Sequence, residues 1–278
     1  DDNMRNYTVG FIGGGNMARA LVGGLISSGY PHENLAVAEP SSTRRTELAP
    51  GLPGVTLSDD NPAIAALADC LVLAVKPQLM REVCLDLRDS VQEHRPLIVS
   101  VAAGTHSRDI EEWLGGDLAV VRVMPNQPAL LLQGASGLYA NARTSNEQRD
   151  RAVEIISAVG SVVNVPDEDS IDAVTAISGT GPAYFYLLID ALIRSAEEFG
   201  LDPQAAHKLV MDTARGSAAL AAVSGETMEA MIEHVRSPGG TTSAAFAIFD
   251  ERDIRDIFAE AFAAARERSR QLAEDSGQ

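Results

Sequence analysis

Cysteine, aromatic residues and positive charge are all scarce in this sequence. Only two cysteines occur among 278 residues, aromatic residues make up 5%, and 22 lysines and arginines stand against 39 aspartates and glutamates. Cys70 and Cys84 are too few for a disulfide framework and are not spaced as metal ligands, which fits a reducing cytoplasm. The net charge of -17 argues against nucleic acid and anionic membranes as partners, because both favour basic surfaces.

The sequence also has no pattern typical of a secretion signal or a membrane span. It opens on acidic residues, and we take Met4 as the natural start. The longest apolar stretch, Ala183–Ile193, is short and contains Asp190. The five histidines have no metal-ligand spacing, so no metal is expected. These features predict a cytoplasmic protein without a membrane partner.

The first part of the chain alternates short β-branched runs with helical patterns. The strand-like runs are Thr8–Ile12, Leu35–Ala38, Cys70–Val75, Leu97–Val101, Ala119–Met124 and Gly137–Tyr139. Helical patterns between them include Met17–Ser28, Pro62–Ala68 and Arg108–Leu114. This rhythm predicts an α/β fold, a doubly wound parallel sheet with helices on both faces.

After Pro166 the pattern becomes all helical. The expected helices are Ile171–Phe199, Pro203–Ser224, Met228–His234 and Ser243–Ala273. The sequence therefore predicts two domains, an α/β domain over residues 1–165 and an all-α domain over residues 166–278. Helices such as Ala205–Ala222 are apolar over most of their circumference, so we expect the second domain to pack against a second copy of the chain.

A glycine-rich segment follows the first expected strand. Gly13-Gly14-Gly15-Asn16-Met17-Ala18 matches G-x-G-x-x-G/A, with a strand before it and a helix after it. Gly13 permits the tight turn, Gly15 lets a pyrophosphate approach the backbone, and Ala18 allows close packing of helix on strand. A plain glycine turn is the other reading. The context favours a Rossmann-type dinucleotide site.

The end of the second strand gives conflicting signals on the cofactor. Glu39 could bind the adenosine ribose 2′-hydroxyl and repel a 2′-phosphate, which favours NAD(H). Ser41, Ser42, Arg44 and Arg45 could instead hold the 2′-phosphate of NADP(H). The alternative for the two arginines is a solvated helix face. The sequence leaves this choice open.

Other strand ends should lie at the same edge of the sheet. Lys76 precedes Pro77 and indicates a fixed turn near the cofactor rather than a catalytic base. Asn61 is interpreted first as a helix N-cap and second as an adenosine contact. The small residues of Ala102–Gly104 would allow close approach of the cofactor ring. Met124–Pro128 ends a further strand, so this segment should also lie at that edge of the sheet.

Near the far end, Ser237-Pro238-Gly239-Gly240-Thr241-Thr242 precedes an apolar helical run. Two glycines allow close approach to a ligand, and a helix opened by threonines presents unpaired N–H groups that favour an anion. The segment could hold a small carboxylate with a hydroxyl beside it. An ordinary capped turn is the competing interpretation.

Taken together, six segments resemble the pyrroline-5-carboxylate reductase family, in order along essentially the whole chain. They are Gly13–Ala18, Ala74–Pro77, Ala102–Gly104, Met124–Pro128, Asp172–Tyr184 and Ser237–Thr242. The resemblance implies an oxidoreductase that reduces 1-pyrroline-5-carboxylate to L-proline with NADPH or NADH, the last step of proline biosynthesis. It also implies a C-terminal dimerisation domain and a homodimer or an assembly of dimers such as a decamer.

The resemblance assigns roles position by position. The implied substrate-binding residues are Glu168, Thr180, His234, Ser237, Gly239, Gly240, Thr241 and Thr242. The implied cofactor-binding residues are Ile12, Gly13, Gly14, Gly15, Asn16, Met17, Glu39, Ser41, Asn61, Ala74, Val75, Lys76, Pro77, Ala103 and Asn126. The chain departs from the family pattern at Thr180, Gln127, Arg236, Thr227-Met228 and His234.

An iminium is already electrophilic, so positioning should supply most of the rate. Thr242 is the expected catalytic residue, orienting the ring nitrogen. A hydroxyacid or acyclic-imine dehydrogenase is one alternative, but such enzymes often use a lysine as acid–base, and Ile171–Phe199 has none. A non-catalytic NAD(P)-binding protein is a second alternative. Such a protein would have no need of the carboxylate-holding segment Ser237–Thr242.

Overall fold

The computed structural model describes residues 7–276, so Met4 lies outside the described residues. These residues form two compact units. The first contains the chain up to Thr180 together with the segment from Ala264 onward, and the second is Gly181–Ala263.

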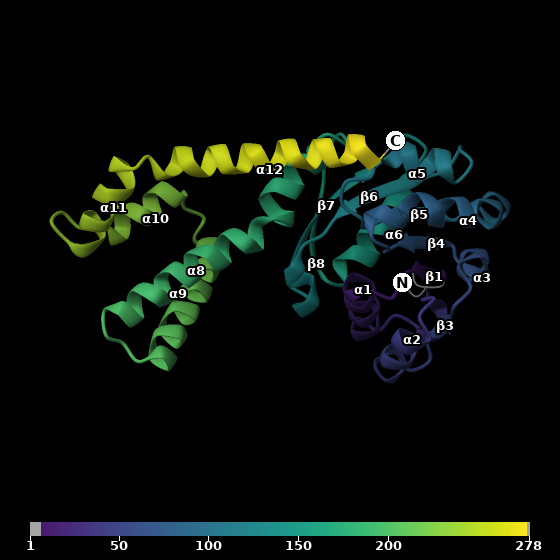
Figure 1. Ribbon diagram of the computed structural model, residues 1–278, viewed down its shortest axis with the longest axis horizontal. Helices are drawn as coiled ribbons and strands as arrows, with labels where there is room; N and C mark the ends of the chain where they lie inside the picture. Colours follow the sequence, from purple (N-terminus) through teal and green to yellow (C-terminus); the bar gives the residue numbers. More distant parts are fainter. Residues whose placement is uncertain (1–6, 277–278) are drawn as a thin grey trace. The chain divides into compact units, whose positions relative to one another are not determined.

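The first unit is built on an eight-stranded sheet with the order β3-β2-β1-β4-β5-β6-β7-β8 (Figure 1). The strands are β1 (Val9–Ile12), β2 (Leu35–Ala38), β3 (Thr56–Ser58), β4 (Cys70–Leu73), β5 (Leu97–Ser100), β6 (Val120–Met124), β7 (Gly134–Ala140) and β8 (Gly160–Asn164). The order reverses at β1, between β2 and β4. In such sheets, ligands bind beside the carboxyl ends of the strands at this reversal.

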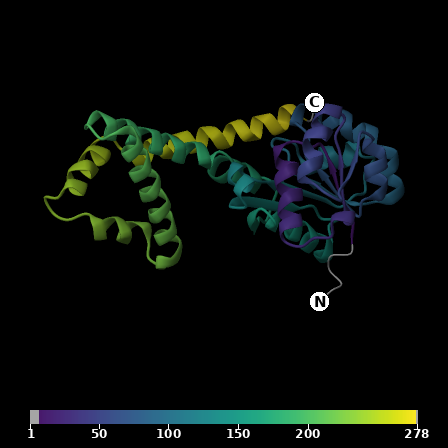
Figure 2. The same cartoon turned by 90° about the horizontal axis from the view of Figure 1, so that it is seen from below.

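Helices cover both faces of this sheet, as expected (Figure 2). The helices of the first unit are α1 (Asn16–Ser27), α2 (Ser42–Leu48), α3 (Asn61–Leu67), α4 (Met80–His94), α5 (Ser107–Trp113), α6 (Asn146–Ser157), α7 (Ser170–Val174) and the end of α12 (Ile254–Ser276). Side chains of α1 and α6 form one core with one face of the strands, and those of α3, α4 and α5 form a second core with the other. Because central strands bury both faces, their sequences are continuous apolar runs rather than alternating ones.

Two details of the sheet differ from the sequence-based expectation. Strands β3 and β8 were not expected, because β3 has only three residues and β8 is mostly exposed. The sheet is also not wholly parallel, since β7 pairs antiparallel with β6. Residues 125–133 join these two strands and are too few for the crossover that a parallel pair requires.

The second unit is all helical, as predicted for this part of the chain. Its helices are α8 (Gly181–Glu198), α9 (Pro203–Ser224), α10 (Met228–Val235), α11 (Thr241–Glu251) and the beginning of α12. The expected single helix Ser243–Ala273 is wrong, because α11 ends before Arg252 and Asp253 has a left-handed φ of 49°. That conformation interrupts a helix of L-residues.

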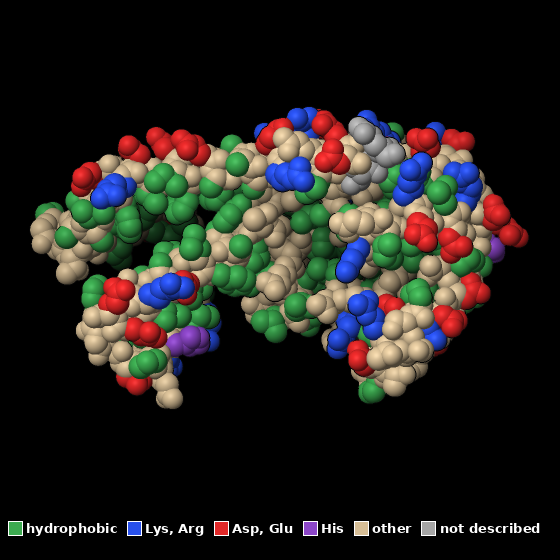
Figure 3. Space-filling model, in the orientation of Figure 1, with side chains coloured by type: hydrophobic (Ala, Val, Ile, Leu, Met, Phe, Trp, Pro, Cys, Tyr) green, Lys and Arg blue, Asp and Glu red, His purple; other side chains and the backbone are tan. Residues whose placement is uncertain are grey.

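Large apolar side chains are exposed on this helical unit. Phe199 is 85% exposed, Val223 80%, and Phe185 and Leu187 68% each. Figure 3 shows hydrophobic side chains gathered over the part of the unit that α11 and the beginning of α12 form. Contiguous exposed apolar surface of this kind marks an interaction surface. One helical run, Ser170–Glu198, is long and apolar enough to cross a membrane by length and composition alone.

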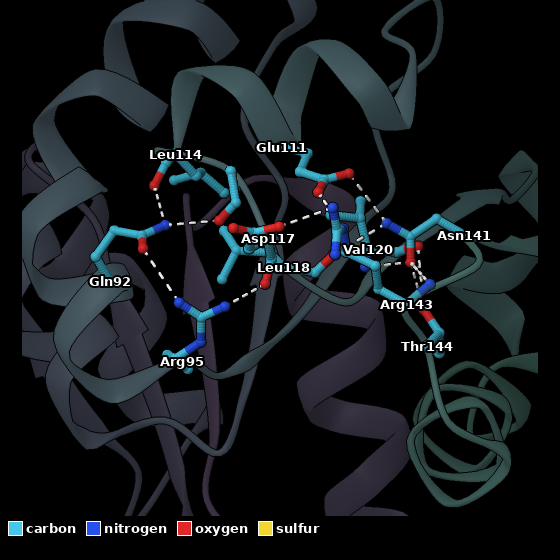
Figure 4. A network of polar contacts seen from close by, with 11 residues as sticks. Gln92, Arg95, Glu111, Leu114, Asp117, Leu118, Val120, Asn141, Arg143 and Thr144 are labelled. Atoms are coloured by element: carbon cyan, nitrogen blue, oxygen red, sulfur yellow. Dashed lines mark hydrogen bonds and ion pairs between the residues drawn. The ribbon is translucent and has the colours of Figure 1, made fainter.

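A polar network holds the edge of the sheet at which β6 begins (Figure 4). Asn141 accepts the Val120 N–H at 3.2 Å and donates to the Leu118 carbonyl at 3.0 Å. Arg143 pairs with Glu111 and with Asp117, both at 2.7 Å. The network fixes the end of α5 against β6 on the side of the sheet opposite to the carboxyl ends of β1, β4 and β5.

Candidate active site

The loop between β1 and α1 has the geometry of a phosphate cradle. Gly13 has a φ of +97°, and a Cβ placed there would lie 2.8 Å from the Ala74 carbonyl oxygen. A Cβ on Gly15 would meet nothing within 4 Å. Helix α1 begins directly after Gly15 without a capping side chain and without an acidic residue in its first turn. Free N–H groups therefore face open space, as binding of a pyrophosphate requires.

Glu39 at the end of β2 holds this loop in place. Its side chain is almost wholly buried and accepts hydrogen bonds from the Gly14 N–H at 3.1 Å and the Ser41 N–H at 2.9 Å. Arg45 donates to the Glu39 and Pro40 carbonyls and contacts Asp59, so its guanidinium is engaged within the protein. A buried carboxylate thus lies directly beside the glycine loop.

Asn61 has a different role from the one first expected. The N-cap of α3 is Asp60, whose side chain accepts the Ala63 N–H at 2.9 Å, so the interpretation of Asn61 as the N-cap is wrong. The Oδ1 atom of Asn61 is buried and accepts no hydrogen bond from the described residues. A buried acceptor without a donor is costly. It suits the second interpretation, contact with a donor on a bound nucleotide.

The ends of β4 and β5 lie beside the glycine loop. The Ala74 N–H donates to the Ile12 carbonyl at 2.9 Å, which joins the ends of β4 and β1. Lys76 is exposed and Pro77 begins a 3₁₀ turn, as the dipeptide predicts. After β5, Ala103 is half-buried between Ala102 and Gly104, which are buried.

Asn126, after β6, is engaged within the first unit. Its Nδ2 donates to the Ser178 carbonyl at 3.2 Å, and its Oδ1 accepts the Ala135 N–H at 2.9 Å. Ser178 belongs to a single π-helical turn, Thr175–Gly179, inside the Asp172–Tyr184 motif. Thr180 follows this turn, is exposed, and donates its hydroxyl to the Thr175 carbonyl at 3.0 Å. Such π-turns are frequent at functional sites.

Glu168 is clamped by four protein contacts. Its carboxylate accepts the Ser107 N–H at 2.6 Å and the Ser107 hydroxyl at 2.7 Å, and it lies 3.3 Å from Arg122 Nη1 and 3.6 Å from His106 Nδ1. Burial alone would raise the pKa of Glu168, but the hydrogen bonds from His106 and Ser107 and the charge of Arg122 outweigh it and lower this pKa to about 2. Glu168 is therefore a carboxylate at neutral pH.

In the second unit, the segment Ser237–Thr242 forms a tight turn into α11. The Gly240 N–H and the Ser243 hydroxyl both donate to the Ser237 carbonyl, at 3.0 and 2.6 Å, and Gly239 has a φ of +72°. No side chain caps α11 and no acid lies in its first turn. Its first N–H groups and the Thr242 hydroxyl can receive an anion. The competing interpretation, a tight turn with an N-cap, fits the backbone as well, with Gly240 as the N-cap and no side chain in that role.

Three departures from the family pattern are accommodated locally. Arg236 lies 3.4 Å from Asp250 and 5.3 Å from the centre of the Phe246 ring, so it braces α11. The Thr227 hydroxyl accepts the Ala230 N–H at 3.2 Å and caps α10. His234 lies 3.2 Å from Glu226. His234 also borders a mostly apolar cavity of about 690 Å³ between α8, α9 and α10.

The predicted cofactor residues thus cluster at one edge of the first unit, and most predicted substrate residues lie on the second unit. Sequence reasoning missed the partners of Glu168, namely Arg122, His106 and Ser107. The sequence did contain one sign of this buried ion pair. Arg122 is the only charged residue within the apolar strand β6, and its side chain is 1% exposed, so it requires a buried partner.

The residues present fit a dinucleotide, given the open backbone at Gly15 and the unpaired acceptor of Asn61. Within residues 7–276, no group of three or more His, Cys, Asp or Glu side chains is arranged to hold a metal ion. Cys70 and Cys84 are both buried, and neither forms a disulfide within the described residues.

Comparison with known proteins agrees with this arrangement. The sequence model described as pyrroline-5-carboxylate reductase dimerisation matches residues 168–272, and the one described as NADP oxidoreductase coenzyme F420-dependent matches residues 8–104. Pyrroline-5-carboxylate reductase of Pseudomonas aeruginosa is 43% identical over 275 residues, which is 99% of this chain and 100% of that protein.

Solved structures give the same result. A pyrroline-5-carboxylate reductase from Coxiella burnetii is 38% identical with a TM-score of 0.91, covering 96% of this chain and 98% of that one. The Plasmodium falciparum pyrroline carboxylate reductase with NADP bound is 28% identical with a TM-score of 0.86, covering 98% of this chain and 100% of that one. This chain therefore belongs to the pyrroline-5-carboxylate reductase family.

Proposed function

We propose that this chain reduces 1-pyrroline-5-carboxylate to L-proline with NAD(P)H, the final step of proline biosynthesis. The observation that carries the proposal is the 43% identity to a pyrroline-5-carboxylate reductase over the full length of both chains. The cradle at Gly13–Gly15 and the anion-receiving start of α11 supply the two functions that the reaction needs, one for the nucleotide and one for the substrate.

The chemistry divides between the cofactor and the chain. A bound reduced nicotinamide would supply a hydride to the ring carbon of the C=N bond. In the iminium form of the substrate, the ring nitrogen already carries the proton that the amine product needs. The N–H groups at the start of α11 and the Ser237–Thr241 turn hold the substrate carboxylate. The Thr242 hydroxyl orients the ring nitrogen. Thr180 and His234 remain predicted substrate contacts. With no strong acid or base required, positioning accounts for most of the rate.

The proposal is tested by oxidation of NADPH and NADH followed at 340 nm with pyrroline-5-carboxylate as substrate. Oxidation that depends on this imine, with formation of L-proline, is the expected result. Turnover of acyclic imines or hydroxy acids in its place would assign the chain to another dehydrogenase class. Nucleotide binding without turnover of any of these substrates would make it a non-catalytic NAD(P)-binding protein.

Glu39 should set the cofactor preference. Replacing Glu39 with serine removes the carboxylate that would repel a 2′-phosphate, and exposed Arg44, 3.8 Å from Glu39, becomes free to attract one. We expect the ratio of kcat/KM for NADPH to that for NADH to rise by at least about tenfold. Glu39→Gln is the matched variant, because it keeps an acceptor for the Gly14 N–H and loses only the charge. An unchanged ratio in both variants would show that Glu39 does not set the preference between NADPH and NADH.

The family model described as pyrroline-5-carboxylate reductase dimerisation matches residues 168–272, which supports an oligomer. The exposed apolar side chains of α8 and α9 and the cavity beside them fit burial against a second copy. A homodimer, or an assembly of dimers such as a decamer, is the proposed state, in the cytoplasm and without nucleic-acid or membrane partners. Light scattering of the purified protein gives the mass that decides the assembly.

A further inference from the structure

The loop between β5 and α5 carries Ala103, one of the implied cofactor-binding residues, in the segment expected to approach the cofactor ring. The Val101 N–H donates to the Leu73 carbonyl at 3.2 Å, so the loop leaves the sheet beside the end of β4. From there to α5 the chain has no regular structure, and Gly104 adopts a φ of +68°. The loop therefore depends on contacts with other segments to hold its shape.

Glu168 supplies one set of these contacts from 61 residues away in the sequence. It accepts both the N–H and the hydroxyl of Ser107, the first residue of α5, and lies next to His106. Arg122, buried on β6, lies 3.3 Å from the same Oε1 atom that accepts the Ser107 N–H. Charge-assisted hydrogen bonds of this kind are strong and directional. The end of the loop is thus tied to the sheet through one side chain.

The end of α12 covers the loop from another direction. A Cβ on Gly104 would lie 3.3 Å from the Cβ of Leu272, so α12 packs directly on this glycine. One turn earlier, the Ser269 hydroxyl donates to Asp172 at 2.7 Å, and both residues are buried. Asp172 lies one turn after Glu168. The same short stretch of chain, 168–172, therefore anchors both the loop and the helix that packs on it.

We propose that Glu168 is a positioning residue for the cofactor: it fixes the β5–α5 loop so that Ala103 is held against the nicotinamide, and it does not bind the substrate directly. This rests on the proposed function for the identity of the cofactor. The inference replaces the role that the family resemblance implies for Glu168 with one in which its carboxylate is already engaged by Ser107, His106 and Arg122.

The test compares Glu168→Ala and Glu168→Gln with wild type and with Glu111→Gln. Glu111 lies on α5, the helix that Glu168 contacts, and like Glu168 it pairs with an arginine, but at the opposite edge of the sheet. Dissociation constants for NADPH and NADH are measured by nucleotide fluorescence without substrate. We expect Glu168→Ala to weaken binding of both nucleotides at least about tenfold, and Glu168→Gln, which keeps an acceptor for the Ser107 N–H, to weaken it less. Glu111→Gln should bind as wild type does.

Hydrogen exchange gives a readout independent of binding. Amides of residues 102–107 should exchange faster in Glu168→Ala and not in Glu111→Gln. If Glu168→Ala does not fold, Gly104→Ala takes its place, since its methyl group would displace Leu272 and is expected to weaken nucleotide binding in the same way.

Two outcomes overturn the proposal. One is unchanged nucleotide affinity in the variants. The other is a rise confined to KM for the imine, which would make Glu168 a substrate ligand. A wild-type protein that binds NAD(P)H without reducing the imine would defeat the proposed function and leave this inference standing.

Discussion

Replacing Gly15 with alanine is expected to leave the fold intact and to weaken NAD(P)H binding by at least about 100-fold, the loss of two charge-assisted hydrogen bonds of about 1.5 kcal/mol each. Gly15 has a φ of -71°, which alanine adopts without strain, and a Cβ there meets no protein atom within 4 Å. The methyl group would stand in the space through which a pyrophosphate reaches the start of α1. Nucleotide fluorescence titration and thermal unfolding measure the two effects separately.

Gly23→Ala is the matched control on the same helix. A Cβ on Gly23 also meets nothing within 4 Å, but this residue lies within α1, away from the loop. Alanine there should stabilise the protein by about 0.5–1 kcal/mol and leave nucleotide affinity unchanged. Wild-type affinity in Gly15→Ala would show that the glycine loop does not cradle the cofactor.

Thr242→Ala is expected to lower kcat/KM for the imine by roughly 100-fold, which is the typical contribution of one positioned hydrogen-bond or proton-transfer group. The hydroxyl lies in the first turn of α11, where no capping side chain competes for the unpaired N–H groups. Nucleotide affinity should not change, because Thr242 is a proposed contact of the substrate and is not among the implied cofactor-binding residues. Steady-state kinetics and nucleotide titration of the same preparation test both statements.

Two further threonine variants complete this test. Thr242→Ser keeps the hydroxyl and should stay within about threefold of wild type. Thr227→Ala removes the cap of α10 and should cost about 1 kcal/mol of stability without lowering kcat/KM. A Thr242→Ala enzyme with wild-type kcat/KM would exclude a role for this hydroxyl in the reaction.

The sequence was most informative where a structural requirement is local. A tight turn with an approaching phosphate needs glycine at particular positions, so Gly13 and Gly15 could be assigned before the structure was known. The strands β1, β2, β4, β5 and β6 could be located for a similar reason, because a strand buried on both faces is a short apolar run. The confirmed family membership follows from several such local segments in the right order.

Requirements that depend on distant residues could not be predicted in this way. The contacts of Glu168 with Ser107 and Arg122 form only because the sheet brings their segments together. The sequence around each residue does not indicate which residue it will contact. The break at Asp253 is similar, since the alanine-rich sequence on both sides of it favours a continuous helix. Asn61 was misassigned as the N-cap of α3 because the neighbouring Asp60 can also cap this helix and occupies that position in the structure.

The return of residues 264–276 to the first unit makes the second unit an insertion within the first rather than an appendage at its end. A gene fragment that stops at Thr180 would lack Ser269 and Leu272, and would therefore lack the cover over Asp172 and Gly104. To isolate the nucleotide-binding part, one would excise residues 181–263 and join the remaining ends through a short linker. For the same reason, a chimera that exchanges the second unit between two relatives must join the two sequences at two places, near Thr180 and near Ala264.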